Sequence, residues 1–274
     1  MILNGRNDSD GRQSNNHARH RKRACDAVLQ HVLRTAQRRR MRPSRRCRRR
    51  EWNPVAVERA GLRKEEIHDL FVTHAHTDHL LGVIWLVRMA LQFRYSLNIW
   101  SHAKVLSLLD GICRQILPQK EVSRLGDLVA FQRLEDGGTF RVGDMNFQCF
   151  DIHSSKEPQF GFTAIFANGR HLCCLGDEPF NPLCREYAQD ADWLMHEAFC
   201  TYADRERFRP YEKSHSTARD AGRNAHELRA RNLILYHTED RTLETRSERY
   251  ANEAHEAFTG NIIVPDDLQI IPLD

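Results

Sequence analysis

The chain has 274 residues, of which 41% are hydrophobic, which is enough for one large or two small globular domains. The absence of any run of eighteen apolar residues excludes a membrane-spanning helix, and the first thirty residues lack a signal peptide's apolar stretch, so we expect a cytoplasmic protein. The formal charge of +4 is unevenly distributed. Residues 1–50 hold 16 Lys and Arg against 3 Asp, and the other 25 basic and 34 acidic residues give the rest a net charge of −9.

Residues 1–55 carry none of the periodic patterns of helices or strands. Apolar residues are sparse, and arginine runs such as "RRRMRPSRRCRRR" are typical of a disordered basic arm. A basic surface of the kind that binds nucleic acid would rest wholly on this segment. We therefore predict an atypical Arg-rich segment at 1–55 and a folded domain at 56–274.

The folded region reads as an α/β protein. After a helix that ends near residue 61, the apolar spacing predicts helices at 79–93, 103–116, 216–230 and 244–258. Strands are predicted at 67–75, 97–102, 128–134, 138–143, 146–154, 192–199, 232–240 and within 260–273. Residues 161–179 are predicted to form two strands joined at Asn168-Gly169, a strong hairpin signal. The eight cysteines include no Cys-x-x-Cys pair, so we expect reduced, buried thiols.

One short segment, "FVTHAHTDHLLG" at 71–82, concentrates metal-binding side chains between a strand and a helix. Its candidate ligands are His74, His76, Asp78 and His79. The carboxyl end of a strand is where α/β folds place their sites, and a turn that aims alternate side chains at different points suits two adjacent metal ions. Imidazole with carboxylate is a typical zinc set, although Mn²⁺ or Fe²⁺ would also accept it.

Further candidates follow other apolar strands. His153, Asp177 and His237 each close a predicted strand, which makes them candidate ligands. A second set comprises His196 and Glu197 in "LMHEAF" and His215 in "KSHSTARD". Ser214 or Ser216 beside His215 could instead serve only to cap the following helix.

These motifs resemble the metallo-β-lactamase superfamily and, within it, the ribonuclease Z-like branch. "THAHTDH" matches the signature His-x-His-x-Asp-His loop, "HEAF" is similar to that branch's His-Glu-Ala-Thr motif, and "HSTARDA" resembles its His-Ser-Thr motif. The resemblance implies a four-layer αββα sandwich with two divalent metal ions. It implies that His74, His76 and His153 hold one ion, that Asp78, His79 and His237 hold the other, and that Asp177 bridges them. It also implies that His215 and Glu197 carry out proton transfer at the scissile phosphate. We add Asp78 and His196 as further candidate catalytic residues.

The expected function is hydrolysis of phosphodiesters, similar to ribonuclease Z, the tRNA 3′-processing endonuclease. The projecting arm that grips tRNA in that branch is missing between His153 and Asp177, and the folded part is acidic, so RNA is one candidate substrate among phosphodiesters. Branch members often form homodimers, and no membrane partner is expected. One alternative is hydrolysis of a lactone, thioester or sulfate ester by the same metals. Another is a basic-arm nucleic-acid-binding protein with a vestigial metal domain, whose binding should fall steeply with salt.

The N-terminal strands of that family have no counterpart in the Arg-rich segment. GC-rich coding sequence that is translated in the wrong reading frame yields arginine runs. For residues 28–34 and 39–54, codons exist that encode strand-like sequence when the reading frame is shifted by one nucleotide. We hypothesise a frameshift across residues 15–55, which would remove strands that belong to the fold. Stop codons in the +1 frame across codons 16 to 54 of the gene would refute it.

Overall fold

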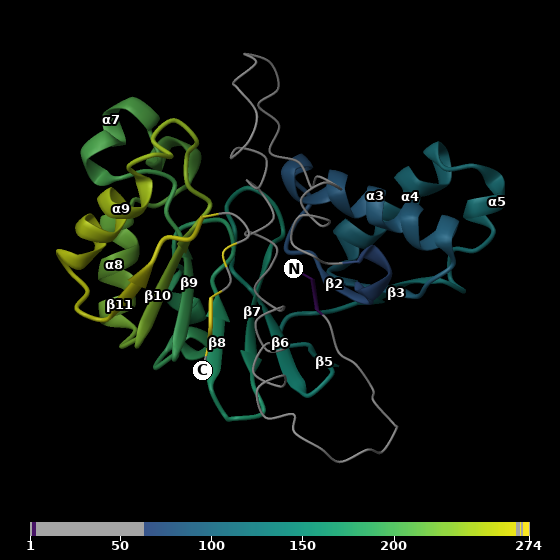
Figure 1. Cartoon of the computed structure of the whole chain (residues 1–274), viewed down its shortest axis with the longest axis horizontal. Coiled ribbons are helices and arrows are strands. Elements are labelled where there is room, and N and C mark those ends of the chain that lie inside the picture. The colour runs from purple at the N-terminus through teal and green to yellow at the C-terminus, as the bar shows by residue number, and fades with distance from the viewer. Residues whose placement is uncertain (1, 4–62, 267–268, 270, 274) are drawn as a thin grey trace. The chain divides into compact units, whose positions relative to one another are not determined.

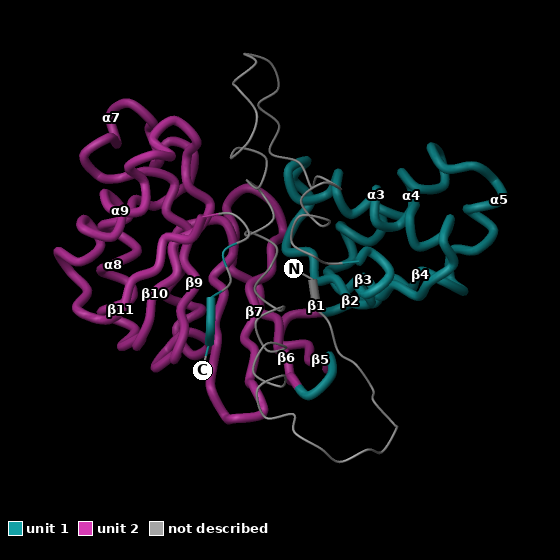
Figure 2. Tube along the Cα trace, in the orientation of Figure 1, with its two compact units in different colours: residues 1–134, 142–144, 267–274 teal, residues 135–141, 145–266 magenta. Residues whose placement is uncertain are grey.

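The computed structural model describes residues 2–3, 63–266, 269 and 271–273. Figure 2 shows that the chain divides into two compact units. Unit 1 contains residues 1–134, 142–144 and 267–274, and unit 2 contains residues 135–141 and 145–266. The predictions of a basic arm, of a frameshift and of a helix that ends near residue 61 lie outside the described residues, apart from residues 2–3.

Unit 1 contains a four-stranded sheet in the order β1-β2-β3-β4. β1 is antiparallel to β2, whereas β2, β3 and β4 are parallel to one another. No strand was predicted at the position of β1. The strands are β1 (Ile2–Leu3), β2 (Asp69–Phe71), β3 (Leu97–Ser101) and β4 (Val129–Arg133). The helices are η3 (Lys64–Glu66), α3 (Thr77–Phe93), α4 (Ala103–Ile116) and α5 (Gln119–Val122).

The core of unit 1 lies between its helices and one face of its sheet (Figure 1). The buried residues of α3 recur at helical spacing and form a single apolar stripe: Leu80, Val83, Leu86, Val87, Ala90 and Leu91. They pack against buried strand residues such as Leu70, Leu97 and Ile99. The helix ends at Arg94, whose left-handed backbone (φ 60°) terminates the hydrogen-bond ladder.

Unit 2 contains a seven-stranded sheet in the order β11-β10-β9-β8-β7-β6-β5. β8 to β11 are parallel, and β7 is antiparallel to both β6 and β8. The strands are β5 (Thr139–Val142), β6 (Met145–Asp151), β7 (Phe160–Ile165), β8 (His171–Cys174), β9 (Trp193–Glu197), β10 (Asn232–Tyr236) and β11 (Asn261–Ile263). The helices are η4 (Pro182–Cys184), α6 (Arg185–Ala188), η5 (Tyr202–Asp204), α7 (Arg205–Phe208), η6 (Tyr211–Lys213), α8 (Ala218–Glu227) and α9 (Arg246–His255).

α8 and α9 pack against each other and against the parallel strands of unit 2 (Figure 1). A Cβ atom at Gly222 of α8 would collide with the backbone of Ala254 in α9, so this close approach requires a glycine. α8 begins at a capping box, in which the Thr217 side chain and Asp220 exchange hydrogen bonds with each other's backbone N–H groups. The N-cap is thus Thr217, so the alternative in which Ser214 or Ser216 serves only to cap this helix does not hold.

Most predicted elements are confirmed, with shifted ends. The helix at 103–116 has the predicted bounds, and the predicted hairpin is present as β7 and β8, with Gly169 at φ 80° in the turn. β2 is shorter than predicted because the chain leaves the sheet after Phe71 and forms the histidine-rich loop. The short helices α5, α6 and α7 were not predicted, since four residues are too few to show helical periodicity.

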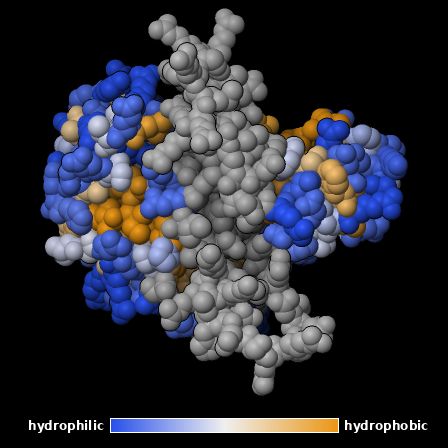
Figure 3. Space-filling view, in the orientation of Figure 1, coloured by the Kyte–Doolittle hydropathy of each residue, from blue (hydrophilic) through white to orange (hydrophobic). Residues whose placement is uncertain are grey.

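The state of the cysteines and the polarity of the surface also agree with what the sequence predicts. The six cysteines that the structure describes are buried and free, as expected. Most of the described surface visible in Figure 3 is hydrophilic, in keeping with the polar outer faces of α8 and α9. Within the described ranges, no helix has both the length and the apolar character that crossing a membrane requires.

Candidate active site

The histidine-rich loop of unit 1 begins where β2 ends. The hydroxyl of Ser101 on β3 donates a hydrogen bond of 2.6 Å to the carbonyl of Val72 and so holds the start of the loop against the neighbouring strand. His76 is the N-cap of α3, and Asp78 and His79 lie in its first turn. His74 is fully buried, although it carries a polar ring. The loop is therefore held between β2 and α3, and this restricts the directions in which its side chains can point.

In this loop, the imidazole of His74 contacts those of His76 and His79. Nε2 of His74 lies 2.8 Å from Nδ1 of His76, and the ring centroids of His74 and His79 are 4.1 Å apart. Thr73 contacts the other nitrogen of His74 at 2.9 Å. The side chains of Asp78 and His79 approach to 3.8 Å. Imidazole nitrogens and a carboxylate gathered within one turn are the donor set that zinc prefers.

In unit 2, three acidic or imidazole side chains follow three adjacent parallel strands. Asp177 follows β8, Glu197 ends β9 and His237 follows β10. The carboxyl ends of parallel strands meet at one edge of a sheet, so topology alone brings these residues together. Nδ1 of His237 lies 2.9 Å from Oδ1 of Asp177. His237 has a left-handed backbone (φ 53°), which turns the chain sharply as it leaves β10.

His215 reaches the same group from the segment between η6 and α8. A hydrogen bond of 2.9 Å from its N–H to the carbonyl of Pro210 fixes its backbone. Its ring centroid is 5.0 Å from that of His237. Asp177, His215 and His237 are buried, and each offers a ligand atom within 4.8 Å of the others. Asp177 and His237 offer a carboxylate and an imidazole that suit a divalent metal ion, and His215 lies directly beside them.

Glu197 is fully buried beside this group. One oxygen accepts a short hydrogen bond from the backbone N–H of Ser216, and the other lies 3.6 Å from Nδ1 of His215. Burial raises the pKa of Glu197 from 4.5 to about 7, because desolvation disfavours the charged form. Burial lowers the pKa of His215, and the charge of Asp177 opposes this shift. Burial therefore favours the uncharged form of both groups.

His196 occupies a different environment from Glu197, although it is the preceding residue. Alternate side chains of a strand point to opposite faces, so His196 faces α8. Its Nδ1 contacts the carbonyl of Glu197 at 2.6 Å, and its Nε2 contacts the amide of Asn224 on α8 at 2.9 Å. Both nitrogens have partners inside the protein, and the ring is fully buried. The imidazole therefore ties β9 to α8, and its catalytic role stays a prediction.

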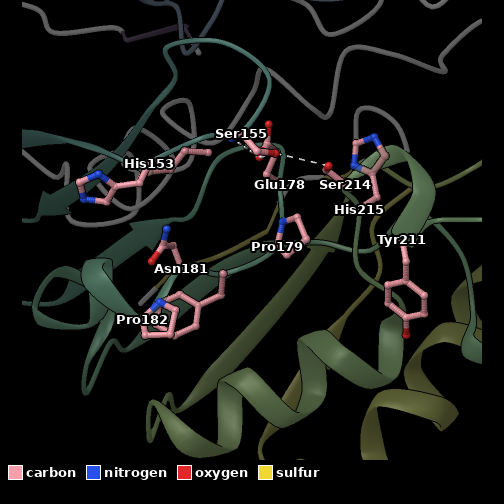
Figure 4. A pocket seen from close by; sticks show the side chains of 11 residues that line it. His153, Ser155, Glu178, Pro179, Asn181, Pro182, Tyr211, Ser214 and His215 are labelled. Carbon is pink, nitrogen blue, oxygen red and sulfur yellow. Dashed lines mark hydrogen bonds between the residues drawn. The ribbon is translucent and has the colours of Figure 1, made fainter.

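His153 follows β6 on the rim of a pocket of about 460 Å³ in unit 2. Figure 4 shows His153 and His215 on different sides of this pocket. His153 is exposed, with a left-handed backbone (φ 56°), and its N–H donates to the carboxylate of Asp151 at 2.8 Å. It does not belong to the group of Asp177, His215 and His237, so its predicted role as a ligand stays a prediction.

Glu178 lines the pocket and was not predicted as a site residue. Its carboxylate is buried and accepts hydrogen bonds from the hydroxyl of Ser154 at 2.5 Å and from the N–H and hydroxyl of Ser155 at 3.2 and 3.4 Å. Figure 4 shows Glu178 beside Ser155. It therefore ties the loop after β6 to the loop after β8. The only sequence signal for Glu178 was its position directly after Asp177. Its hydrogen-bond partners Ser154 and Ser155 lie more than twenty residues earlier in the chain, so the sequence did not reveal this contact.

Comparison with known proteins supports the fold. Residues 25–238 match the beta-lactamase superfamily domain, a range that begins inside the Arg-rich segment. A ribonuclease Z of Bacillus cereus (strain ZK / E33L) is 37% identical over 144 residues, which are 53% of this chain and 43% of that protein. The chain thus aligns with less than half the length of this curated relative.

Solved structures share the fold at low sequence identity. The short form of human tRNase Z has a TM-score of 0.61 and 19% identity, covering 82% of this chain and 86% of that chain. The metallo-beta-lactamase fold protein YhfI from Bacillus subtilis has a TM-score of 0.58 and 17% identity, covering 74% and 77%. The predicted fold is confirmed, and the chain belongs to the metallo-β-lactamase superfamily, within which it resembles the ribonuclease Z-like branch.

Proposed function

We propose that this protein is a dinuclear metal-dependent hydrolase that cleaves phosphodiesters. The observation that carries the proposal is the buried group of Asp177, His215 and His237 at the carboxyl edge of the parallel strands, with Glu197 beside it. This group joins metal-ligand chemistry to a carboxylate–imidazole pair suited to proton transfer. The ribonuclease Z relatives, whose name denotes cleavage of RNA, support phosphodiesters as the substrate class.

The proposed ligands are the residues that the resemblance to the family implies. His74, His76 and His153 would hold one ion, Asp78, His79 and His237 the other, and Asp177 would bridge them. The fit rests on donor chemistry, since each unit gathers imidazole nitrogens with a carboxylate. Zn²⁺ suits these donors, and Mn²⁺ or Fe²⁺ would also accept them. Bound ions would supply Lewis acidity, which activates water near neutral pH and stabilises charge on phosphate oxygens.

The chain itself supplies the proton for the leaving group. His215 would donate it, because burial lowers the pKa of this imidazole and makes its protonated form a stronger acid. Glu197 would orient His215, since one of its oxygens lies 3.6 Å from Nδ1 while the other is held by the N–H of Ser216. Burial of this pair excludes water, which strengthens their interaction with a reacting phosphate.

We propose a short phosphodiester, an RNA end included, as the substrate. The region after residue 50 has a net charge of −9, which disfavours a long polyanion. The interval between His153 and Asp177 is occupied by a loop and the hairpin of β7 and β8, with no room for a tRNA-gripping arm. A compact substrate that depends on the metal site for charge compensation fits these two facts.

The test has two stages. Metal analysis of the purified protein should find two divalent ions per chain, and bis-p-nitrophenyl phosphate should be hydrolysed faster than a tRNA precursor or a lactone. His215→Ala should lower cleavage of a dinucleotide, whose alkoxide leaving group needs a proton, by about 10²–10⁴-fold, the usual contribution of a general acid. Turnover within a few-fold of wild type would exclude His215 as the acid. Preferred hydrolysis of a lactone, thioester or sulfate ester would overturn the substrate class.

A further inference from the structure

Phe199 is the last residue of "HEAF", where the motif that it resembles has threonine. Three hydrogen bonds fix its backbone. Its N–H donates to the carbonyl of Ser216 at 2.9 Å, and its own carbonyl accepts from the N–H of Glu239 at 2.8 Å and from the hydroxyl of Tyr250 at 3.1 Å. A half-buried ring on so constrained a backbone has few orientations open to it.

The ring of Phe199 lies flat against the imidazole of His215. Their centroids are 5.0 Å apart and their planes are inclined by 17°. The ammonium group of Lys213 lies 4.9 Å from the centroid of the Phe199 ring. The ring of Phe208 packs edge-on against the Phe199 ring, with 6.4 Å between the two centroids. Lys213 is held in turn by a hydrogen bond of 2.9 Å to the carbonyl of Phe208. Phe199 is therefore held in place by its neighbours as well as by its backbone.

The carboxylate of Glu197 cannot fix the plane of the His215 ring by itself. The 3.6 Å between Nδ1 of His215 and the nearer oxygen of Glu197 exceeds the range of a hydrogen bond. A charge at that distance attracts the imidazole but leaves its rotation about the Cβ–Cγ bond weakly defined. Offset stacking against a phenyl ring does restrict that rotation, because tilting the imidazole loses contact area.

We propose that Phe199 is a positioning residue, which holds the imidazole of His215 in the plane required for proton transfer. This inference rests on the proposed function, in which His215 is the proton donor. A general acid acts only within hydrogen-bond reach of its acceptor, and a misplacement of about 1 Å can cost about 100-fold in rate. The phenyl ring of Phe199 would thus orient the His215 imidazole by stacking, which a threonine hydroxyl at this position of the motif cannot do.

The experiment compares three variants of the full-length, metal-loaded protein. Phe199→Leu keeps the apolar volume and removes the aromatic face, Phe199→Tyr restores that face, and Phe208→Leu removes a ring that touches Phe199 but not His215. Steady-state kinetics with a dinucleotide, whose alkoxide leaving group needs the proton that His215 would donate, and NMR spectra of the His215 ring protons are the two readouts. The ring protons report the stack directly, because a phenyl face shifts the resonances of protons above it upfield.

For Phe199→Leu we expect kcat to fall by about 10- to 100-fold with KM within about twofold, and the His215 resonances to move downfield. Phe199→Tyr should keep both properties near wild type, and Phe208→Leu should leave the His215 resonances in place. Resonances that move while kcat stays at the wild-type value would overturn the inference, as would an equal loss in the Leu and Tyr variants.

The proposed function and this inference fail separately. If the wild-type protein carries its metals but turns over no phosphodiester, the proposed function fails. The NMR comparison then still decides whether Phe199 orders His215, because the resonance shift needs no turnover. His215 resonances that are unchanged in Phe199→Leu would show that the ring orders nothing.

Discussion

Nδ1 of His237 lies 2.9 Å from Oδ1 of Asp177, although the two residues follow different strands of the sheet in unit 2. Glu197 belongs to the strand between them, so three neighbouring strand ends supply one acidic and imidazole-rich group. Parallel strands align their carboxyl ends, and each connection must turn there, which makes this edge the natural place for a polar site.

Asp177→Ala should reduce metal content and activity together. Removing the proposed bridging carboxylate takes a ligand from both ions, so we expect less than half of the wild-type zinc content and a loss of phosphodiesterase activity of at least about 100-fold. Elemental analysis and kinetics check this. Asp190→Ala is the matched control, because Asp190 is exposed and its carboxylate pairs with the exposed Arg229. Full metal content in Asp177→Ala would remove this residue from the metal site.

Glu197 should make the metal-free protein less stable as pH rises. Its pKa is raised by burial from 4.5 to about 7, so the folded protein holds this proton more tightly than the unfolded chain does. The resulting stabilisation is complete below pH 4.5 and is lost as pH rises through about 7, with a magnitude on the order of 3 kcal/mol.

Urea denaturation in EDTA at pH 5 and pH 8 measures this effect. Glu197→Gln retains an oxygen that can accept the hydrogen bond from Ser216 but does not titrate, so its stability should change less between the two pH values. The difference between wild type and variant isolates Glu197 from other titrating groups. Equal pH dependence in both proteins would show that Glu197 titrates normally.

Glu178→Ala should loosen the pocket in unit 2. The carboxylate accepts hydrogen bonds from Ser154 and Ser155, and its removal leaves their donors without this acceptor, which should cost about 2–3 kcal/mol of unfolding free energy. Glu178→Gln, which keeps one acceptor oxygen, should lose less. Glu186→Ala on the exposed face of α6 serves as the control for removing an acidic side chain. Chemical denaturation that ranks the Gln variant below the Ala variant would contradict the role given to this carboxylate.

The buried thiols should resist modification in the native protein. Burial raises the pKa of Cys113, Cys149 and Cys184 to about 11 and that of Cys200 to about 12, so almost no thiolate forms at pH 8. In a variant with Cys25 and Cys47 replaced by serine, Ellman's reagent should react slowly with the native protein. It should then detect six thiols in guanidinium chloride. Rapid reaction of the native variant would show that one of these thiols is accessible.

Local sequence patterns predicted the regular elements well. The apolar spacing in residues 103–116 matches α4 from end to end, because helical burial repeats every three to four residues and leaves its period in the sequence. Asn168-Gly169 located the hairpin because few other residue pairs accept its backbone angles. The cap of α8 could not be identified from the sequence, because Ser214, Ser216 and Thr217 all have hydroxyls that can cap a helix. Only the path of the chain decides that Thr217 takes this role.

The sequence by itself determined the chemistry of this protein: the histidine-rich loop, the polar residues at strand ends and the alternation of helices and strands are all local patterns. Only the tertiary structure decided which of these residues meet. It separated His196, which packs against α8, from Glu197, which faces His215, and it placed Phe199 against the His215 ring and Glu178 against Ser154. Such contacts join residues that are distant in the sequence, and their distances depend on strand order and helix packing, which leave no short-range signal in the chain.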